Sequence, residues 1–132
     1  MQIEQHKSPL IIYTPGTSNK SIIQDIASQL DIYPTIMGML RIPYTNNSMG
    51  IDLFKEKREY AFFYNNKNLG VIDNNYYSIL RKKVSQTLFK YHNNDLNNYF
   101  ENFKAKSDSM RIYAYSMVQA SQYLVKHKKL VR

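Results

Sequence analysis

The sequence predicts an α/β fold, in which a short parallel or mixed strand and a helix precede a small antiparallel sheet and a C-terminal packing helix. Three patterns favour it: an early continuous apolar run, a central series of short aromatic and β-branched runs, and a helical apolar spacing near the end. With 132 residues and 43% apolar content, the chain suits one compact unit with a real core. We divide it into residues 1–53, 54–106 and 107–132.

The first part begins with a predicted strand. Residues 10–13 read Leu-Ile-Ile-Tyr, a β-prone run that ends at Pro15 and Gly16. Because the run is continuously apolar, it is typical of a strand covered on both faces, as in a parallel or mixed sheet. Residues 21–30 follow with a weakly helical apolar spacing.

A helix is expected after Asp31. This residue stands where an N-cap belongs, and Pro34 fits the first turn, where its missing donor does no harm. The helix should end near Arg41, with Pro43 beyond it. Its packed side is predicted to consist of Ile36, Met37, Met39 and Leu40.

The middle part reads as an antiparallel meander. Short runs at 59–64, 69–73, 76–80 and 86–91 are separated by polar turns, the first of them Asn-Asn-Lys-Asn. A final helix is predicted from Ser107 or Asp108 to about Lys126. Its sheet-facing residues should recur at intervals of three and four, namely Met110, Tyr113, Ala114, Met117, Ser121 and Leu124.

Composition excludes some functions and leaves others open. There is no cysteine, so a disulfide frame, a thiolate metal site and a thiol nucleophile are all excluded. The formal charge of +8 arises from 18 Lys and Arg against 10 Asp and Glu, which makes nucleic acid or anionic lipid possible partners by charge alone. Tyrosines interleave with basic residues between 76 and 91, but aromatic residues in short strands are more often packing residues, so no nucleic-acid partner is expected.

Three features occur in a fixed order: "HKSPLIIYTPG", then "SQLDIYPTIMGMLRI", then "SMGIDLF" followed by "REYAFFY". That order resembles the C-terminal portion of sulfatase-like enzymes of the alkaline phosphatase superfamily, especially phosphoglycerol and phosphoethanolamine transferases and lipoteichoic acid synthases. The resemblance covers residues 5–80. The matching positions are Lys7, Pro9 to Ile12, Pro15, Gly16, Gln29, Asp31, Pro34, Thr35, Gly50 and Leu53.

The resemblance implies the C-terminal part of an alkaline-phosphatase-like α/β/α domain, so residues 1–132 would be one partial domain. It also implies that the missing N-terminal catalytic portion holds the nucleophile and a divalent Zn or Mn ion, which would act on lipid-linked or other phosphate or sulfate esters. The full enzyme would sit in the inner membrane with an extracytoplasmic catalytic domain. The N-terminal apolar run is too short for a span or signal peptide, so the chain alone would stay cytoplasmic.

Candidate site residues are few. His6 and Lys7 precede the predicted strand, and the resemblance places them near the active-site cleft, where cationic groups can hold a phosphate or sulfate. No catalytic residue or metal ligand is predicted: the three histidines lie in separate segments, and no cofactor is expected to bind this chain. Asp31 and Thr35 are more simply explained by capping and local hydrogen bonding.

Three hypotheses of function follow. The first is a C-terminal fragment of a sulfatase-like phosphotransferase or hydrolase, inactive alone. The second is an independently folded basic module that binds a protein, a membrane surface or a polyanion without catalysis. The third is the remnant of a broken gene. A partial domain should leave residues 10–13 and the helix bearing Ile36 to Leu40 with an uncovered apolar face, which an independent module should not.

Overall fold

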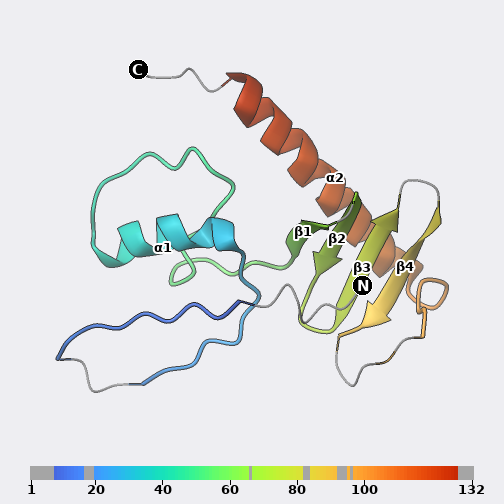
Figure 1. Cartoon of the computed structure of the whole chain (residues 1–132), viewed down its shortest axis with the longest axis horizontal. Helices are drawn as coiled ribbons and strands as arrows, with labels where there is room; N and C mark the ends of the chain where they lie inside the picture. The colour runs from blue at the N-terminus through green and yellow to red at the C-terminus, as the bar shows by residue number, and fades with distance from the viewer. Residues whose placement is uncertain are drawn as a thin grey trace.

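The computed structural model describes residues 8–16, 20–65, 67–81, 84–91, 95 and 97–127. The chain divides into two regions (Figure 1). A four-stranded sheet with a long helix forms one region, and a short helix with two extended N-terminal segments forms the other. The protein is therefore a small α/β structure with its sheet in the middle of the sequence.

The sheet is an antiparallel meander in the order β1-β2-β3-β4. Its strands are β1 (Ala61–Asn65), β2 (Asn68–Ile72), β3 (Tyr76–Arg81) and β4 (Val84–Lys90). The register pairs Phe62 with Val71, and Val71 in turn with Ser78. The predicted meander is confirmed, because alternating apolar residues and polar turns specify strand and hairpin locally.

Helix α2 (Lys104–His127) crosses one face of the sheet and continues past it (Figure 1). It begins before the predicted caps, and Ser107 is instead a fully buried residue of its first turns. The predicted face is correct in the first half of α2, where Met110 and Ala114 are completely buried and Tyr113 packs against the core. Met117, Ser121 and Leu124, further along the predicted face, are only partly buried and do not belong to the core. They close the main core with Tyr60, Val71, Leu80 and Leu88.

The N-terminal region differs from the prediction. Residues 8–14 have no regular secondary structure, so the strand expected at 10–13 is not formed. The helix suggested for residues 21–30 is also wrong: residues 21–28 are irregular, and only a 3-10 turn, η2 (Gln29–Asp31), precedes the helix α1 (Ile32–Met39). A strand needs a neighbour for its backbone groups, and none of the described residues supplies one to 10–13.

Helix α1 buries a different side from the one predicted. Pro34 and Thr35 are buried, whereas Ile36, Met39 and Leu40 are exposed. The helix starts where it was predicted to start, with Asp31 at the N-cap position, but the Asp31 carboxylate makes no capping hydrogen bond to α1. Instead, Ser28 caps η2 by accepting from the Leu30 amide, and the Asp31 carboxylate accepts from the Ser28 amide to complete a capping box. The apolar side of α1 thus lacks the cover that its composition calls for.

Candidate functional site

The carboxylate of Asp31 is completely buried and accepts four hydrogen bonds. One carboxylate oxygen accepts from the Ser28 amide at 2.7 Å and from Arg58 Nε at 2.9 Å. The other accepts from the Ile51 amide at 2.9 Å and from Arg58 Nη2. All four acceptor positions are filled. Asp31 is therefore unavailable as a general base or metal ligand.

Arg58 joins the two regions of the protein. Besides the pair with Asp31, its guanidinium donates to the Met49 carbonyl at 2.9 Å and to the Tyr113 hydroxyl at 3.1 Å. Tyr113 lies on α2 and donates to the Tyr60 carbonyl at 2.8 Å. Burial lowers the pKa of Arg58, but the hydrogen bond and charge of Asp31 outweigh it and raise the pKa above its ordinary value. We call Asp31, Arg58 and Tyr113 the buried clamp.

Thr35 also has a structural role. Its side chain is almost fully buried, its hydroxyl donates to the Ile51 carbonyl at 3.4 Å, and the hydroxyl oxygen accepts from the Leu53 amide at 3.1 Å. A hydroxyl held by the backbone on both sides cannot reach a substrate. Thr35 and Asp31 together fasten the segment around residue 51 to α1.

A partly buried ion pair ties α2 to the sheet. Lys106 Nζ lies 2.6 Å from Asp73 Oδ2 and 4.8 Å from the centre of the Tyr60 ring. Asp73 also accepts from the amides of Asn75 and Tyr76, which fixes the turn between β2 and β3. Burial opposes the charge of Lys106, but Asp73 raises its pKa above the ordinary value, and burial likewise raises the pKa of Tyr60.

A hollow with mixed polar and apolar walls lies between the sheet and α2. It has a volume of about 440 Å³ and is lined by Arg81, Gln86, Asp108 and Arg111, among others. Arg111 is already paired with Asp108 at 2.7 Å, and the Gln86 amide is held by Ser78 and the Ser107 carbonyl. Among the described residues that line the hollow, Arg81 is the cation without an ion pair, which is weak support for a polyanion site.

The predicted substrate-binding residues, His6 and Lys7, lie outside the described residues. Within the described ranges, no group of three or more histidine or acidic side chains could hold a metal ion. Over the same ranges, no helix has the length and apolar character to cross a membrane.

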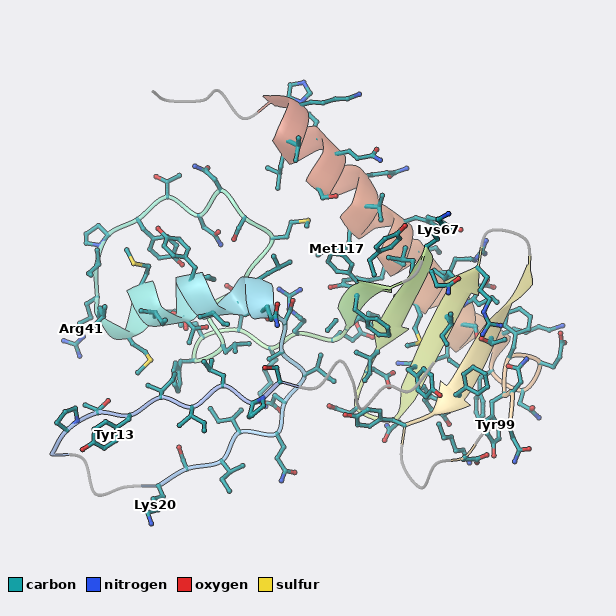
Figure 2. The ribbon with its side chains drawn as sticks, in the orientation of Figure 1. Tyr13, Lys20, Arg41, Lys67, Tyr99 and Met117 are labelled. Atoms are coloured by element: carbon teal, nitrogen blue, oxygen red, sulfur yellow. The ribbon has the colours of Figure 1, made fainter. Side chains whose placement is uncertain are left out.

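The most unusual feature is an apolar surface on the N-terminal region. Among the described residues, twelve of the nineteen exposed large hydrophobic side chains lie before residue 43. Figure 2 shows this side of the molecule, with Tyr13 and Lys20 on the two extended segments and Arg41 beyond α1, far from Tyr99. We call it the N-terminal apolar surface; its members are Leu10, Ile11, Ile12, Tyr13, Ile22, Ile23, Leu30, Tyr33, Ile36, Met39, Leu40 and Ile42.

The size of this surface follows from its exposed fractions, which together equal about seven fully exposed side chains. At roughly 60–120 Å² of apolar area for each such side chain, the surface amounts to roughly 400–800 Å². The largest apolar patch on a typical monomer is about 300–600 Å², and one side of a stable interface buries about 800 Å². The summed exposure thus exceeds that of an ordinary patch, and matches one side of a stable interface, only in the upper part of its range.

Sequence reasoning anticipated Asp31 but missed Arg58, its partner. Arg58 stands in the charged run Lys55-Glu56-Lys57-Arg58-Glu59, where nothing local separates a buried arginine from its exposed neighbours. The only signal in the sequence was the position of Arg58 directly before the predicted strand at residues 59–64.

Comparison with known proteins adds no relative: no protein-family model matches the chain, and no curated protein is significantly similar to it in sequence.

Proposed function

We propose that this chain supplies the C-terminal scaffold of a sulfatase-like phosphotransferase or hydrolase, whose nucleophile and divalent metal, Zn or Mn, lie in another portion of the enzyme. The proposal rests on the order of the three sequence features and on the roles that their residues have. Asp31, Pro34 and Thr35 are buried, and Asp31 and Thr35 bind the backbone of the segment that carries Gly50 and Leu53. In the proposed enzyme, these motif residues hold the segment around residue 51 against α1, and the chemistry belongs to the other portion.

Gly50 illustrates this supporting role. A Cβ atom at this position would lie 1.9 Å from the Leu30 carbonyl oxygen, so only glycine lets the two segments approach. The glycine of the third sequence feature is therefore explained by its packing against the second. The second and third sequence features, although separate along the chain, are therefore in contact in the folded structure.

One observation favours a partial domain over an independent module: the two regions bury their apolar side chains to different degrees. The sheet and α2 enclose a core in which Val71, Leu88, Met110 and Ala114 are fully buried. In contrast, the apolar side chains of residues 10–13 and of the outer side of α1 are all at least 40% exposed. A module that binds a polyanion through its charge has no need for such a surface, whereas a scaffold that completes a larger domain does.

In the complete enzyme, the proposal places a catalytic domain outside the inner membrane, acting on lipid-linked phosphoglycerol, phosphoethanolamine or another phosphate or sulfate ester. The test is reconstitution. The chain and the polypeptide encoded directly upstream are purified separately and mixed, and release of nitrophenol from p-nitrophenyl phosphate and p-nitrophenyl sulfate is followed with Mn²⁺ or Zn²⁺. The mixture should turn over one of these esters and the chain alone neither; turnover by the chain alone contradicts the proposal.

A further inference from the structure

A second hollow lies beside α1, where the chain that leaves this helix turns back. Residues 41–50 arch back from the end of α1 towards its start, where the Ile51 amide donates to the Asp31 carboxylate (Figure 1). The hollow has a volume of about 480 Å³, within the range of about 300–1,000 Å³ that small-molecule sites occupy. We call it the Tyr33 hollow; it is lined by Gln29, Leu30, Tyr33, Thr45, Asn47 and Ser48.

The walls of the Tyr33 hollow carry no charge. Although the whole chain has a formal charge of +8, none of the six lining residues is charged. An anion would therefore find no cation among them. A metal ion or an ammonium group would find no carboxylate, because the neighbouring Asp31 is buried and all its acceptor positions are filled. The walls of this hollow suit a neutral ligand.

The polar side chains of the Tyr33 hollow are available to a ligand. Among the hydrogen bonds of the described residues, none uses the side-chain amide of Gln29 or of Asn47. The hydroxyls of Tyr33 and Thr45 make none either within the same part of the chain. An amide has two donor hydrogens and an acceptor oxygen, and a hydroxyl both donates and accepts. These groups together suit a ligand that carries several hydroxyl groups.

Tyr33 gives the hollow an aromatic surface. Its side chain is 52% exposed, and its ring packs against the Tyr44 ring in a T-shaped arrangement, with the centroids 5.5 Å apart and the planes at 86°. This contact restrains the orientation of the Tyr33 ring. The face of an aromatic ring carries the negative part of its quadrupole, so it attracts the weakly positive hydrogens of C–H groups.

The loop that carries Asn47 has a fixed shape. Asn46 accepts at Oδ1 from the Ser48 amide at 3.1 Å and from the Ser48 hydroxyl at 2.8 Å, and its own side-chain amide donates to the Gly50 carbonyl at 2.8 Å. The Ser48 hydroxyl oxygen in turn accepts from the Gly50 amide at 3.1 Å. Because these bonds order the loop in advance, little ordering of the loop opposes the binding of a ligand.

We propose that the Tyr33 hollow binds a neutral sugar, a hexose or an N-acetylhexosamine. The C–H groups on one side of the sugar ring lie on the Tyr33 ring, and the sugar hydroxyls exchange hydrogen bonds with the amides of Gln29 and Asn47. A sugar combines the required properties, because it is uncharged, has C–H groups on one side and carries hydroxyls that both donate and accept. A purely apolar ligand would instead cover these amides without offering them partners, which is unfavourable.

The expected affinity is low. All six lining residues are exposed, so the hollow covers only one side of a sugar, and a dissociation constant in the millimolar range follows. This inference goes beyond the proposed function, because it assigns to the chain itself a ligand that is neither a phosphate nor a sulfate ester.

The test uses the full chain and the methyl glycosides of glucose, galactose, mannose and N-acetylglucosamine as probes. Amide ¹H and ¹⁵N chemical shifts are followed as each glycoside is raised to tens of millimolar. Binding in the Tyr33 hollow predicts saturable shifts at residues 29–33 and 44–48 with at least one glycoside, while the amides of Val71 and Leu88 in the core stay in place. Glucose 6-phosphate and glucuronate are the charged probes and should bind no more tightly than the neutral glycosides.

Side-chain variants test the two kinds of contact. Tyr33→Ala should weaken binding roughly tenfold because it removes the aromatic surface, whereas Tyr33→Phe should retain most of the affinity. Gln29→Ala and Asn47→Ala, which change exposed side chains, should each weaken binding roughly twofold to tenfold through the loss of hydrogen bonds. Tyr123→Ala is the matched control, because Tyr123 is 61% exposed and lies on α2, outside the hollow; its affinity should equal that of the parent chain.

The outcomes are distinct from those of the proposed function. The absence of saturable shifts with all four glycosides overturns the inference, and so does binding that Tyr33→Ala and Asn47→Ala both leave unchanged. Tighter binding of a charged probe at the same residues also overturns it, because the hollow would then select for charge. The measurement uses the chain alone and no ester, so these results leave the proposed function standing, and that function fails separately if the reconstituted mixture hydrolyses neither ester.

Discussion

Replacing Arg58 by methionine should release α1 from the rest of the protein. The Arg58 side chain is 7% exposed and that of Asp31 is 0% exposed, so the substitution leaves a carboxylate buried with only two backbone donors. It also removes donors from the Met49 carbonyl and the Tyr113 hydroxyl. Removing one partner of a buried pair costs about 3–5 kcal/mol, because the charge left behind is uncompensated.

The loss should be local. The main core of the sheet and α2 contains neither Asp31 nor Arg58, and Tyr113 keeps its bond to the Tyr60 carbonyl. We therefore expect the opening free energy of α1, measured by native-state hydrogen exchange, to fall by about 3–5 kcal/mol while the amides of the sheet keep their protection. Far-UV circular dichroism during urea unfolding should still show one transition for the sheet and α2.

Two further variants make the result decisive. Lys57→Met is the matched control, because Lys57 pairs with Asp25 at the surface, where the two side chains are 80% and 46% exposed, and such pairs contribute about 0–1 kcal/mol. Adding Asp31→Asn to Arg58→Met should restore at least about 1 kcal/mol of the opening free energy of α1, because it removes the buried, unpaired carboxylate charge. If Arg58→Met costs no more than Lys57→Met, the buried clamp does not hold the two regions together.

Four other predictions concern the backbone, the titratable groups and metal ions. Gly50→Ala should destabilise the N-terminal region by about 1–3 kcal/mol in urea unfolding, because its Cβ would overlap the Leu30 carbonyl; an unchanged midpoint contradicts this packing. Lys67 has a φ of 64°, so Lys67→Gly should raise the melting temperature by a few degrees, corresponding to about 1 kcal/mol, and a lower value would show that the lysine side chain stabilises the turn. Because the folded-state pKa of Lys106 is raised above 10.5, its stabilising effect is complete below that pH and is lost as the pH rises through the folded value; the urea midpoint should fall above pH 10.5 more steeply for the parent chain than for Lys106→Met, and parallel curves contradict the pairing with Asp73. Micromolar Mn²⁺ or Zn²⁺ should leave the melting temperature of the chain unchanged, because the described residues offer no group of three metal ligands. A metal that binds the folded form would raise the melting temperature, and such a rise contradicts the prediction.

The sheet and the face of α2 could be predicted because their signals are local. Alternating aromatic and β-branched residues specify each strand of the meander, and the spacing of Met110 and Ala114 specifies the buried side of α2. The start of α2 was missed because Ser107, a good cap by composition, is instead buried beneath the sheet, where its carbonyl accepts from Gln86. Tertiary contact overrode the capping preference at that position.

The N-terminal region was predicted less well for a different reason. The apolar run at residues 10–13 indicates a strand, but a strand forms only where a neighbour offers backbone partners, and no described residue does so. The buried clamp was missed because the partners Asp31 and Arg58 are 27 residues apart and no local pattern links them. Patterns in sequence therefore predicted what each segment favours, whereas the contacts between segments required the structure.

Amide hydrogen exchange on the isolated chain tests most directly whether the chain combines a stably folded region, the sheet with α2, and an N-terminal region that needs a partner. Residues 10–14 and 20–27 should exchange at nearly the rate of an unfolded peptide, while Val71 and Leu88 in the core should exchange only through global unfolding. Strong protection of residues 10–14 in the isolated chain would show that the segment already has a partner within it, and the case for a larger domain would fail.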